Sequence, residues 1–258
     1  MIDISIITIN YNDIGGLNET IESVIHQDYD NFEYIIIDGG SEDGSKQLIE
    51  KYADHVNFWS SEKDDGIYHA MNKGLLKAKG KYVLFLNSGD TFYSNSAITS
   101  FESFFKTVEY DVVYGDISIL DGSRQWLVES PSELTFNYLA KDTLPFPCTI
   151  IKRETLLEFK FDESLKIVSD WKFFILILCK YDKKYKHVPA TIVNFKLGGI
   201  SSTNPELVAI ERRDVLENYF SFFIDEFYEL QSARSMLQSL RKSRKIKWLQ
   251  KFGLLNKF

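Results

Sequence analysis

The stretch YVLFLNSGD, from Tyr82 to Asp90, changes character at its middle. Residues 82–86 are apolar or aromatic, which is typical of a strand that is buried on both faces. Residues 87–90 are small or polar, and the last of them is a carboxylate. Either Asp90 only turns the chain after the strand, or it binds a ligand at the carboxyl end of the strand.

The same alternation of strand and helix precedes this stretch. The predicted elements are strands at 4–9, 33–37 and 56–59 and helices at 17–25, 45–52 and 67–79. Alternating elements with nearly continuous apolar strands predict an α/β fold, in which a mostly parallel sheet is flanked by helices. Ligands of such sheets bind at the carboxyl ends of the strands.

The residues that follow the predicted strands suit a nucleotide. Asp38 follows the second strand, and its carboxylate could accept the ring N–H of uracil, while the Tyr11 ring could stack on the base. Asp90 would repel a diphosphate unless Mg²⁺ or Mn²⁺ lay between them, since these ions bridge carboxylate and phosphate oxygens. No GxxxxGK[ST] or GxGxxG motif follows a strand, which argues against ATPases and dinucleotide dehydrogenases.

The pattern changes beyond residue 95. A helix at 97–108 and a strand at 111–114 are followed by a hairpin, in which Asp121 and Gly122 form the turn between 117–120 and 125–128. A strand at 188–195 precedes helical patterns from Pro205 onward. We therefore expect three segments, at 1–95, at 96–205 and in a helical basic extension at 206–258.

Charge is distributed unevenly along the 258 residues. Residues 232–258 contain eight Lys or Arg and no Asp or Glu, whereas the rest of the chain contains 22 basic and 37 acidic residues. The tail could bind an anionic membrane surface, pack against the body or a partner subunit, or bind nucleic acid. Its interspersed Trp and Leu residues favour the membrane surface and argue against nucleic acid.

The amino terminus and the length of the apolar runs bear on where the protein is located. A strand pattern begins within three residues of Met1, so we expect no signal peptide. No apolar run approaches the roughly 18 residues of a membrane span. We expect a cytoplasmic protein that associates peripherally with the inner face of the membrane through its tail.

Four segments together carry a family resemblance. They are SIITINYN (5–12), EYIIIDGGSEDGS (33–45), EKDDGIYHAMNKGLLKAKGKYVLFLNSGD (62–90) and SDWKF (169–173). In this order they resemble the inverting family 2 glycosyltransferases of GT-A fold, in the branch that builds bacterial surface polysaccharides. The resemblance covers roughly residues 1–205 and implies a nucleotide-diphospho-sugar donor, a UDP-sugar by expectation, and one displacement that inverts the anomeric carbon.

The resemblance also implies roles for single residues in donor binding. Tyr11, Asp38 and Asp65 would hold the nucleoside, and Ser88 would line the sugar site. The metal-binding Asp-x-Asp signature of the family falls on residues 87–90, where only its last carboxylate is retained. Asp90 would therefore be the ligand of Mn²⁺ or Mg²⁺.

The resemblance implies that residues 1–95 form the donor-binding half and residues 96–205 the acceptor-binding and catalytic half of the same domain. Asp170 would be the general base that takes the proton from the acceptor hydroxyl, so that one base and one cation suffice. Asp116, Gly198, Gly199 and Ser201 would contact the acceptor or phosphate. This chain departs from the family pattern at two places that could contact phosphate or acceptor. Met71 stands where many relatives have Arg, and the mostly apolar residues 145–149 stand where many have a His-Gln pair.

The expected function is transfer of a hexose to a growing saccharide on a polyprenyl-diphosphate lipid. A sensor or scaffold that binds nucleotide-sugars without turnover is an alternative, since the first carboxylate of the metal signature is Asn87. A sugar nucleotidyltransferase fits less well, because NYNDIGG after the first strand has no basic residue for a triphosphate.

Overall fold

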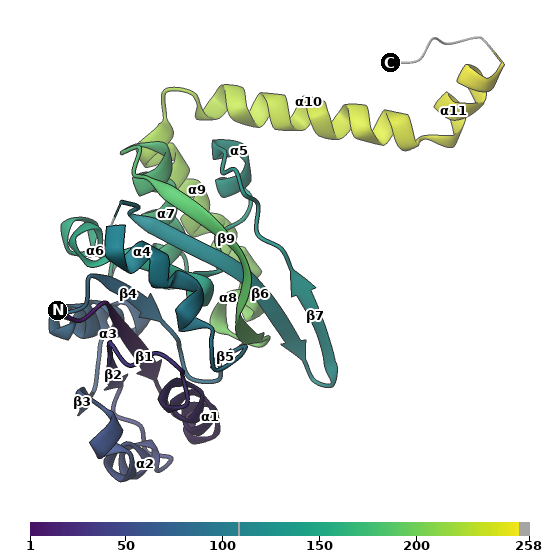
Figure 1. The fold of residues 1–258 in the computed structure, drawn as a ribbon. Helices are drawn as coiled ribbons and strands as arrows, with labels where there is room; N and C mark the ends of the chain where they lie inside the picture. Colours follow the sequence, from purple (N-terminus) through teal and green to yellow (C-terminus); the bar gives the residue numbers. More distant parts are fainter. Residues whose placement is uncertain (108, 253–258) are drawn as a thin grey trace. The chain divides into compact units, whose positions relative to one another are not determined.

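The computed structural model describes residues 1–107 and 109–252, and Figure 1 labels its elements. The strands are β1 (Ile4–Asn10), β2 (Phe32–Asp38), β3 (Phe58–Ser61), β4 (Tyr82–Phe85), β5 (Thr91–Phe92), β6 (Val112–Asp121), β7 (Arg124–Val128), β8 (Thr149–Lys152) and β9 (Tyr185–Lys196). The first helices are α1 (Ile14–Ile25), α2 (Ser45–Lys51), α3 (Ile67–Lys77), α4 (Glu102–Thr107), α5 (Phe136–Leu139) and α6 (Arg153–Phe159). The others are α7 (Ser169–Cys179), α8 (Ile200–Thr203), α9 (Pro205–Phe220), α10 (Ile224–Lys242) and α11 (Arg244–Lys251).

The strands form one sheet with the order β3-β2-β1-β4-β8-β6-β9-β5, and β7 pairs with β6. The predicted α/β fold is confirmed, and β3, β2, β1 and β4 are all parallel. Beyond β4 the sheet is mixed, because β8 runs antiparallel to both β4 and β6. The parallel part therefore brings the ends of β1, β2 and β4 to one edge, where a ligand site is expected.

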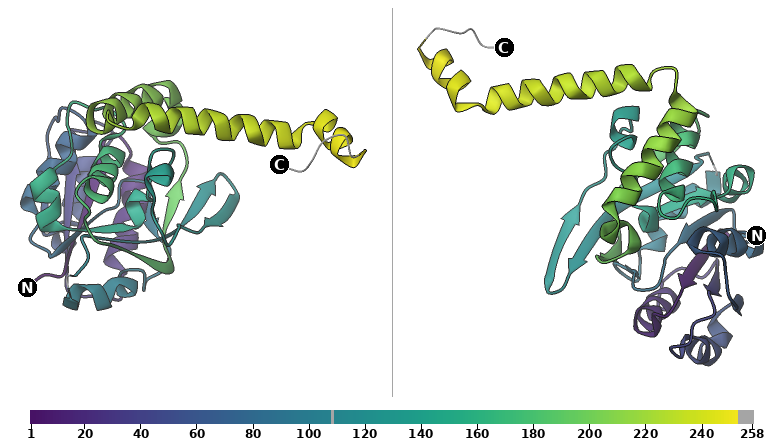
Figure 2. Two further views of the ribbon diagram at one scale, coloured as in Figure 1. Left: turned by 90° about the horizontal axis from the view of Figure 1, so that it is seen from above. Right: turned by 180° about the vertical axis from the view of Figure 1, so that it is seen from behind.

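The strands of the parallel part are buried on both faces. On one face Ile4 and Ile6 of β1 join a cluster that includes Leu17 and Ile21 of α1. On the other face α3 packs so closely that a Cβ atom at Gly74 would lie 2.6 Å from Ile7. The two further views in Figure 2 show helices on both faces of the sheet. This alternation of side chains follows from the two-residue period of a strand.

The predicted hairpin is present, but its first strand is longer than the pattern indicated. Residues 112–114 of the first predicted run and all of 117–120 belong to one strand, β6, whose pairing with β9 is irregular between Tyr114 and Ile117. Gly115 lies in this irregular segment, where a Cβ atom would approach the Ala190 carbonyl oxygen to 2.7 Å. The turn has Gly122 at φ +59°, in the left-handed region that favours glycine.

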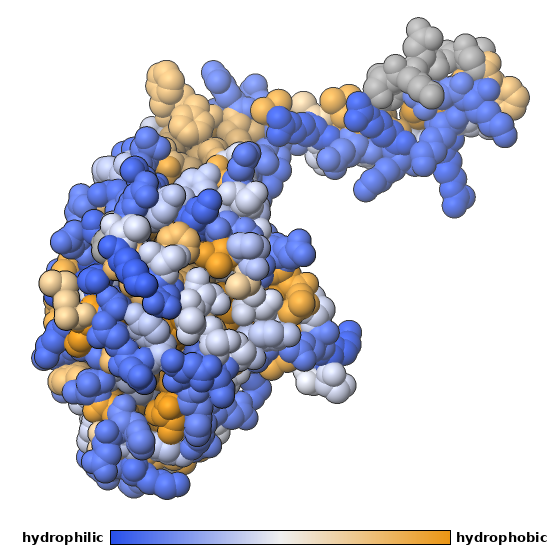
Figure 3. Space-filling model, in the orientation of Figure 1, coloured by the Kyte–Doolittle hydropathy of each residue, from blue (hydrophilic) through white to orange (hydrophobic). Residues whose placement is uncertain are grey.

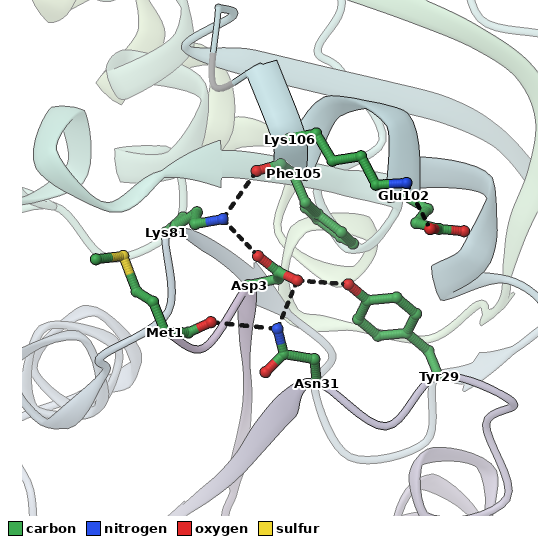
Figure 4. A network of polar contacts seen from close by, with 8 residues as sticks. All are labelled: Met1, Asp3, Tyr29, Asn31, Lys81, Glu102, Phe105 and Lys106. Atoms are coloured by element: carbon green, nitrogen blue, oxygen red, sulfur yellow. Dashed lines mark hydrogen bonds and ion pairs between the residues drawn. The ribbon is translucent and has the colours of Figure 1, made fainter.

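A polar network joins the elements at the amino ends of the parallel strands (Figure 4). The carboxylate of Asp3 accepts hydrogen bonds from Lys81 Nζ (2.7 Å), Tyr29 Oη (2.7 Å) and Asn31 Nδ2 (2.6 Å). Lys81 also donates to the Phe105 carbonyl oxygen at 3.0 Å. These bonds connect the start of β1 with the segments before β2 and β4 and with α4.

The chain divides into two compact units, residues 1–211 and 212–258. The first contains the whole sheet, and the second contains the end of α9 followed by α10 and α11. Across 1–107 and 109–252, no helix combines the length and the apolar character needed to cross a bilayer. The division of the first 205 residues into a donor half and an acceptor half stays a prediction.

Candidate active site

Three strand ends meet through the side chain of Asn10, the last residue of β1. Asn10 pairs with Asp38 in the sheet, and its Nδ2 donates to Asp38 Oδ1 at 2.7 Å. On the other side, Ser88 Oγ donates to Asn10 Oδ1 at 2.8 Å. The residues that follow β1, β2 and β4 are therefore held together by side chains.

A pocket of about 840 Å³ opens at this edge of the sheet. Its lining comes from the ends of β1 and β4, the loops after β2 and β3, and the start of α3: Ile9, Asn10, Tyr11, Asp13, Gly39, Gly40, Glu42, Lys63, Asp64, Gly66, Ile67, Asn87 and Ser88. Of the residues predicted to bind the donor, Tyr11 and Ser88 line the pocket. Asp38, Asp65 and Asp90 are not among the lining residues.

Asp38 is fully buried, and its carboxylate accepts four hydrogen bonds. The donors are Asn10 Nδ2, Ser61 Oγ (2.6 Å), and both the backbone nitrogen (3.0 Å) and Oγ (2.5 Å) of Ser41. Burial raises the pKa of Asp38, but these donors outweigh it and hold the pKa below its usual value. The hydrogen bonds from Ser41 hold the loop that follows β2. Direct contact of Asp38 with a nucleoside stays a prediction.

Gly39 leaves a slot between two side chains of the pocket. A Cβ atom at this position would lie 3.2 Å from the Tyr11 ring and 2.8 Å from Asp64 Oδ2. Tyr11 is 68% exposed, so its ring is available for stacking. A flat group above Gly39 would have an aromatic ring and a carboxylate as neighbours.

Asp64, rather than its neighbour Asp65, faces this slot. Asp64 Oδ1 accepts a hydrogen bond from the backbone of Gly66 at 3.1 Å, which fixes the side chain beside the start of α3. The backbone nitrogen of Asp65 instead donates to His69 Nδ1 at 3.3 Å. Two adjacent carboxylates in a loop give no signal of which one faces inward, and the assignment of Asp65 stays a prediction.

Asn87 and Asp90 have buried oxygen atoms with few partners. Asn87 Oδ1 is buried and has no hydrogen-bond partner among the described residues. Asp90 is 6% exposed, and the described part of the chain gives its carboxylate one hydrogen bond, from the Lys196 backbone at 3.4 Å. Burial raises the pKa of Asp90 to about 7, against a usual value near 3.8.

These oxygens fit a hard divalent cation, which prefers carboxylate and amide oxygen ligands. Within residues 1–107 and 109–252, however, no group of three or more His, Cys, Asp or Glu could hold a metal ion. A cation here would need further oxygens from a ligand, as is usual for Mg²⁺ bound with phosphates. Asn87 was not predicted as a metal ligand, because an amide in place of the first carboxylate of the metal signature indicates that a ligand has been lost.

Asp170 lies in the first turn of α7. The hydroxyl of Tyr68 on α3 donates to Asp170 Oδ1 at 2.9 Å. The residue before Tyr68, Ile67, lines the pocket. Asp170, the predicted base, therefore contacts α3, whose first residue lines the pocket. Its catalytic role stays a prediction.

The predicted acceptor residues lie on two further segments. Asp116 is 8% exposed, and its Oδ1 lies 2.8 Å from His187 Nε2 and accepts from the Ser130 backbone at 2.8 Å. Gly198, Gly199 and Ser201 are exposed in the segment after β9 and do not line the pocket. His187 was missed, since a single histidine in a strand carries no signal of its distant partner.

A family model links this geometry to known proteins. The model described as Glycosyl transferase family 2 matches residues 5–152, which include the strand ends and the pocket. The chain belongs to glycosyl transferase family 2. The surface-polysaccharide branch that the sequence resembles is consistent with this membership.

Two relatives set the scale of the similarity. An uncharacterized glycosyltransferase of Mycobacterium tuberculosis (strain CDC 1551 / Oshkosh) is 42% identical over 90 residues, which is 34% of this chain and 34% of that protein. A PGL/p-HBAD biosynthesis glycosyltransferase of Mycobacterium bovis (strain BCG / Pasteur 1173P2) is 26% identical over 77% of this chain and 79% of its own length. The match to the M. tuberculosis protein thus spans about a third of that protein's length.

Two solved structures share the fold. Residues 1–349 of S. aureus TarS in complex with UDP-GlcNAc give a TM-score of 0.63 at 20% identity, covering 77% of this chain and 59% of that one. The mannosyltransferase PcManGT from Pyrobaculum calidifontis, in complex with GDP-Man and Mn²⁺, gives 0.59 at 15% identity, covering 76% and 57%. At these identities the similarity shows a common GT-A-like fold.

Proposed function

We propose that this family 2 protein transfers a hexose from a UDP-sugar to a saccharide acceptor, with inversion at the anomeric carbon. The donor lies in the pocket at the ends of β1, β2 and β4. The acceptor is a growing surface polysaccharide on a polyprenyl-diphosphate lipid. The resemblance to the glycosyltransferases that build bacterial surface polysaccharides supports this acceptor.

The observation that carries the proposal is the pair of poorly satisfied buried oxygens beside the pocket. Within the described part of the chain, Asn87 Oδ1 has no hydrogen-bond partner and the Asp90 carboxylate has one long hydrogen bond, which is costly because buried polar groups normally have partners. A cation held by these oxygens and by a diphosphate would supply the missing partners. Mn²⁺ or Mg²⁺, when bound, would offset the charge that develops on the leaving diphosphate.

The pocket also suits the base of a uridine nucleotide. Tyr11 and Asp64 flank the space above Gly39, where a pyrimidine could stack on the ring. Uracil carries an N–H at ring position 3 that a carboxylate can accept, whereas cytosine has no hydrogen there. Asp38 supports the same loop from behind, and Ser88 lines the side of the pocket next to β4.

The reaction needs one proton acceptor from the protein. Asp170 would take the hydroxyl proton of the acceptor while that oxygen forms a bond to the anomeric carbon of the donor. The bond from this carbon to the diphosphate oxygen breaks in the same step, and its electron pair leaves with the nucleoside diphosphate. Asp116 and the segment at 198–201 would contact the acceptor.

The substitution Asp170→Asn tests the proposal against a scaffold that only binds. We expect donor hydrolysis and transfer to fall about 10²–10⁴-fold, since the general base is lost, while UDP affinity stays within about twofold. Steady-state hydrolysis of UDP-sugars and calorimetric binding of UDP measure the two effects. A wild-type chain that binds UDP and Mn²⁺ but never turns over a donor would instead be a scaffold.

The tail would bring the enzyme to its lipid-linked acceptor. The helix α11 has four basic residues and no acidic one, and Trp248 and Phe252 are 56% and 59% exposed. Their rings lie 4.6 Å apart, so they form one apolar surface. Figure 3 shows hydrophilic and hydrophobic residues side by side along α10 and α11. We propose that this helix lies on an anionic membrane surface. Residues 253–258 of the predicted tail lie outside the described residues.

Vesicle co-sedimentation tests the membrane proposal. We expect binding to vesicles with anionic lipids, weaker binding at high salt, and loss of binding in a Trp248→Ser/Phe252→Ser variant. Trp126→Ser is the matched control, because Trp126 is also exposed (43%) but lies on β7. Binding that both variants retain equally would contradict the proposal.

A further inference from the structure

Three successive backbone N–H groups converge on one buried carboxylate. Glu211 Oε1 accepts from Lys166 N at 2.7 Å, and Glu211 Oε2 accepts from Ile167 N at 3.0 Å and Val168 N at 3.2 Å. Glu211 lies on α9 and is 7% exposed. Consecutive N–H groups of this kind form a concave binding site for an anion, and here the anion belongs to the chain itself.

This carboxylate lies next to the start of α7. The segment 166–168 leads directly into α7, and Val168 at its N-cap position makes no side-chain capping hydrogen bond. A negative charge near the N-terminus of a helix is favourable. Glu211 supplies this charge while it accepts from the N–H groups directly before the helix, which lie 43 to 45 residues earlier in the chain.

The same segment is fixed from its other side. The hydroxyl of Tyr68 lies 2.5 Å from the carbonyl oxygen of Ile167, and it also contacts Asp170, as described above. Ser169 Oγ accepts a hydrogen bond from Asp162 N at 2.5 Å. The turn that carries Asp170 is therefore held between α3, at the pocket, and Glu211 on α9.

We propose that Glu211 is a positioning residue for the catalytic base: its carboxylate holds the 166–168 turn so that Asp170 faces the acceptor. This inference rests on the proposed function, because it requires Asp170 to act as the base. Glu211 lies beyond residues 5–152, to which the family model aligns. A displacement of the base by about 1 Å is enough to slow a reaction about 100-fold, so the hydrogen bonds of Glu211 affect rate more than donor binding.

The variant Glu211→Gln tests the role, with Glu33→Gln as its matched control. Glu33 is also buried (3%) and also accepts backbone N–H bonds, from Lys79 and from Gly80 (3.1 Å), but at the amino end of β2. We expect kcat to fall about 10–100-fold in Glu211→Gln with KM for the UDP-sugar within about threefold. Glu33→Gln should retain kcat, and Glu211→Asp, which keeps the charge, should recover part of it.

Two further readouts separate positioning from general loss of structure. The concentration of folded protein is taken from the stoichiometry of UDP binding, so that kcat refers to folded molecules. Hydrogen–deuterium exchange at amides 166–168 should be faster in Glu211→Gln and unchanged in Glu33→Gln. Exchange that rises without a loss of kcat, or an equal loss of kcat in both variants, would overturn the role of Glu211. A wild-type chain without turnover would overturn the proposed function, and this role with it.

Discussion

Two pairs of polar side chains, one pair at each end of the parallel strands, differ in how well they are hydrogen-bonded. At the amino end, the Asp3 carboxylate accepts three hydrogen bonds and Glu33 accepts from Ser5 Oγ (2.6 Å) and two backbone nitrogens. At the carboxyl end, Asn87 Oδ1 has no partner among the described residues and Asp90 has one long hydrogen bond. The carboxylates of Asp3 and Glu33 have their partners within the chain, whereas the oxygens of Asn87 and Asp90 leave room for partners from a ligand.

The pKa values of the two carboxylates follow the same division. Burial raises the pKa of Asp3, but Lys81, Tyr29 and Asn31 outweigh it and hold the pKa below its usual value. Burial of Asp90 is opposed by one backbone hydrogen bond, from Lys196, and raises its pKa to about 7. A carboxylate that stabilises the fold and one that is available to a ligand thus differ in how their charge is compensated.

The largest stability effect should come from Asp90→Asn. A carboxyl group with a raised pKa contributes stability that is present below its unfolded value, near pH 4, and is lost as pH rises through about 7. In metal-free protein, the free energy of unfolding of the variant should therefore gain roughly 2–3 kcal/mol relative to wild type between pH 5 and pH 8. Urea unfolding with a chelator measures this gain. A constant difference at both pH values would show that Asp90 is not an uncompensated charge.

Next in size is the effect of Tyr11→Ala on nucleotide affinity. Stacking of a base on an aromatic ring is worth about 1–3 kcal/mol, so UDP should bind about 5–150-fold more weakly. The fold should be unaffected, because Tyr11 is 68% exposed. Tyr93→Ala is the control, since Tyr93 is also exposed (43%) but does not line the pocket. Equal affinities in both variants would remove Tyr11 from the donor site.

The smallest effect should come from Asp3→Asn, at the amino end of the parallel strands. The variant should lose about 1 kcal/mol of unfolding free energy at pH 7, since charge-assisted hydrogen bonds are replaced by neutral ones. Because the pKa of Asp3 is lowered, this loss should be present above about pH 4 and disappear as pH falls through the folded pKa. UDP affinity should not change, and a change would show that the two ends are coupled.

Much of the fold could be predicted because the first half carries strong local signals. The apolar runs of β1, β2 and β4 and the helical spacing of α1 and α3 appear where the sequence pattern predicted them. The short strands β5 and β8 were not predicted, since two to four residues carry little periodicity. Strand direction beyond β4 depends on long-range pairing, so no local pattern indicated the mixed part of the sheet.

The candidate site was predictable in position but not in all of its residues. Tyr11 and Ser88 follow strands and line the pocket as expected. The choice between Asp64 and Asp65 depends on the hydrogen bond of Asp64 to Gly66, which is set by loop geometry. Glu211 is far in sequence from the turn that it binds, and only the packing of α9 brings it there.

Calorimetric titration of UDP, with and without Mn²⁺, into wild type and Asp90→Asn tests the central claim most directly. The claim is that the buried oxygens at the carboxyl end hold a cation together with the donor diphosphate. It predicts UDP binding in wild type that strengthens markedly with Mn²⁺, and a variant in which this Mn²⁺-dependent gain is lost. A UDP affinity that is unchanged by Mn²⁺ and by the substitution, or no binding of UDP at all, would contradict it.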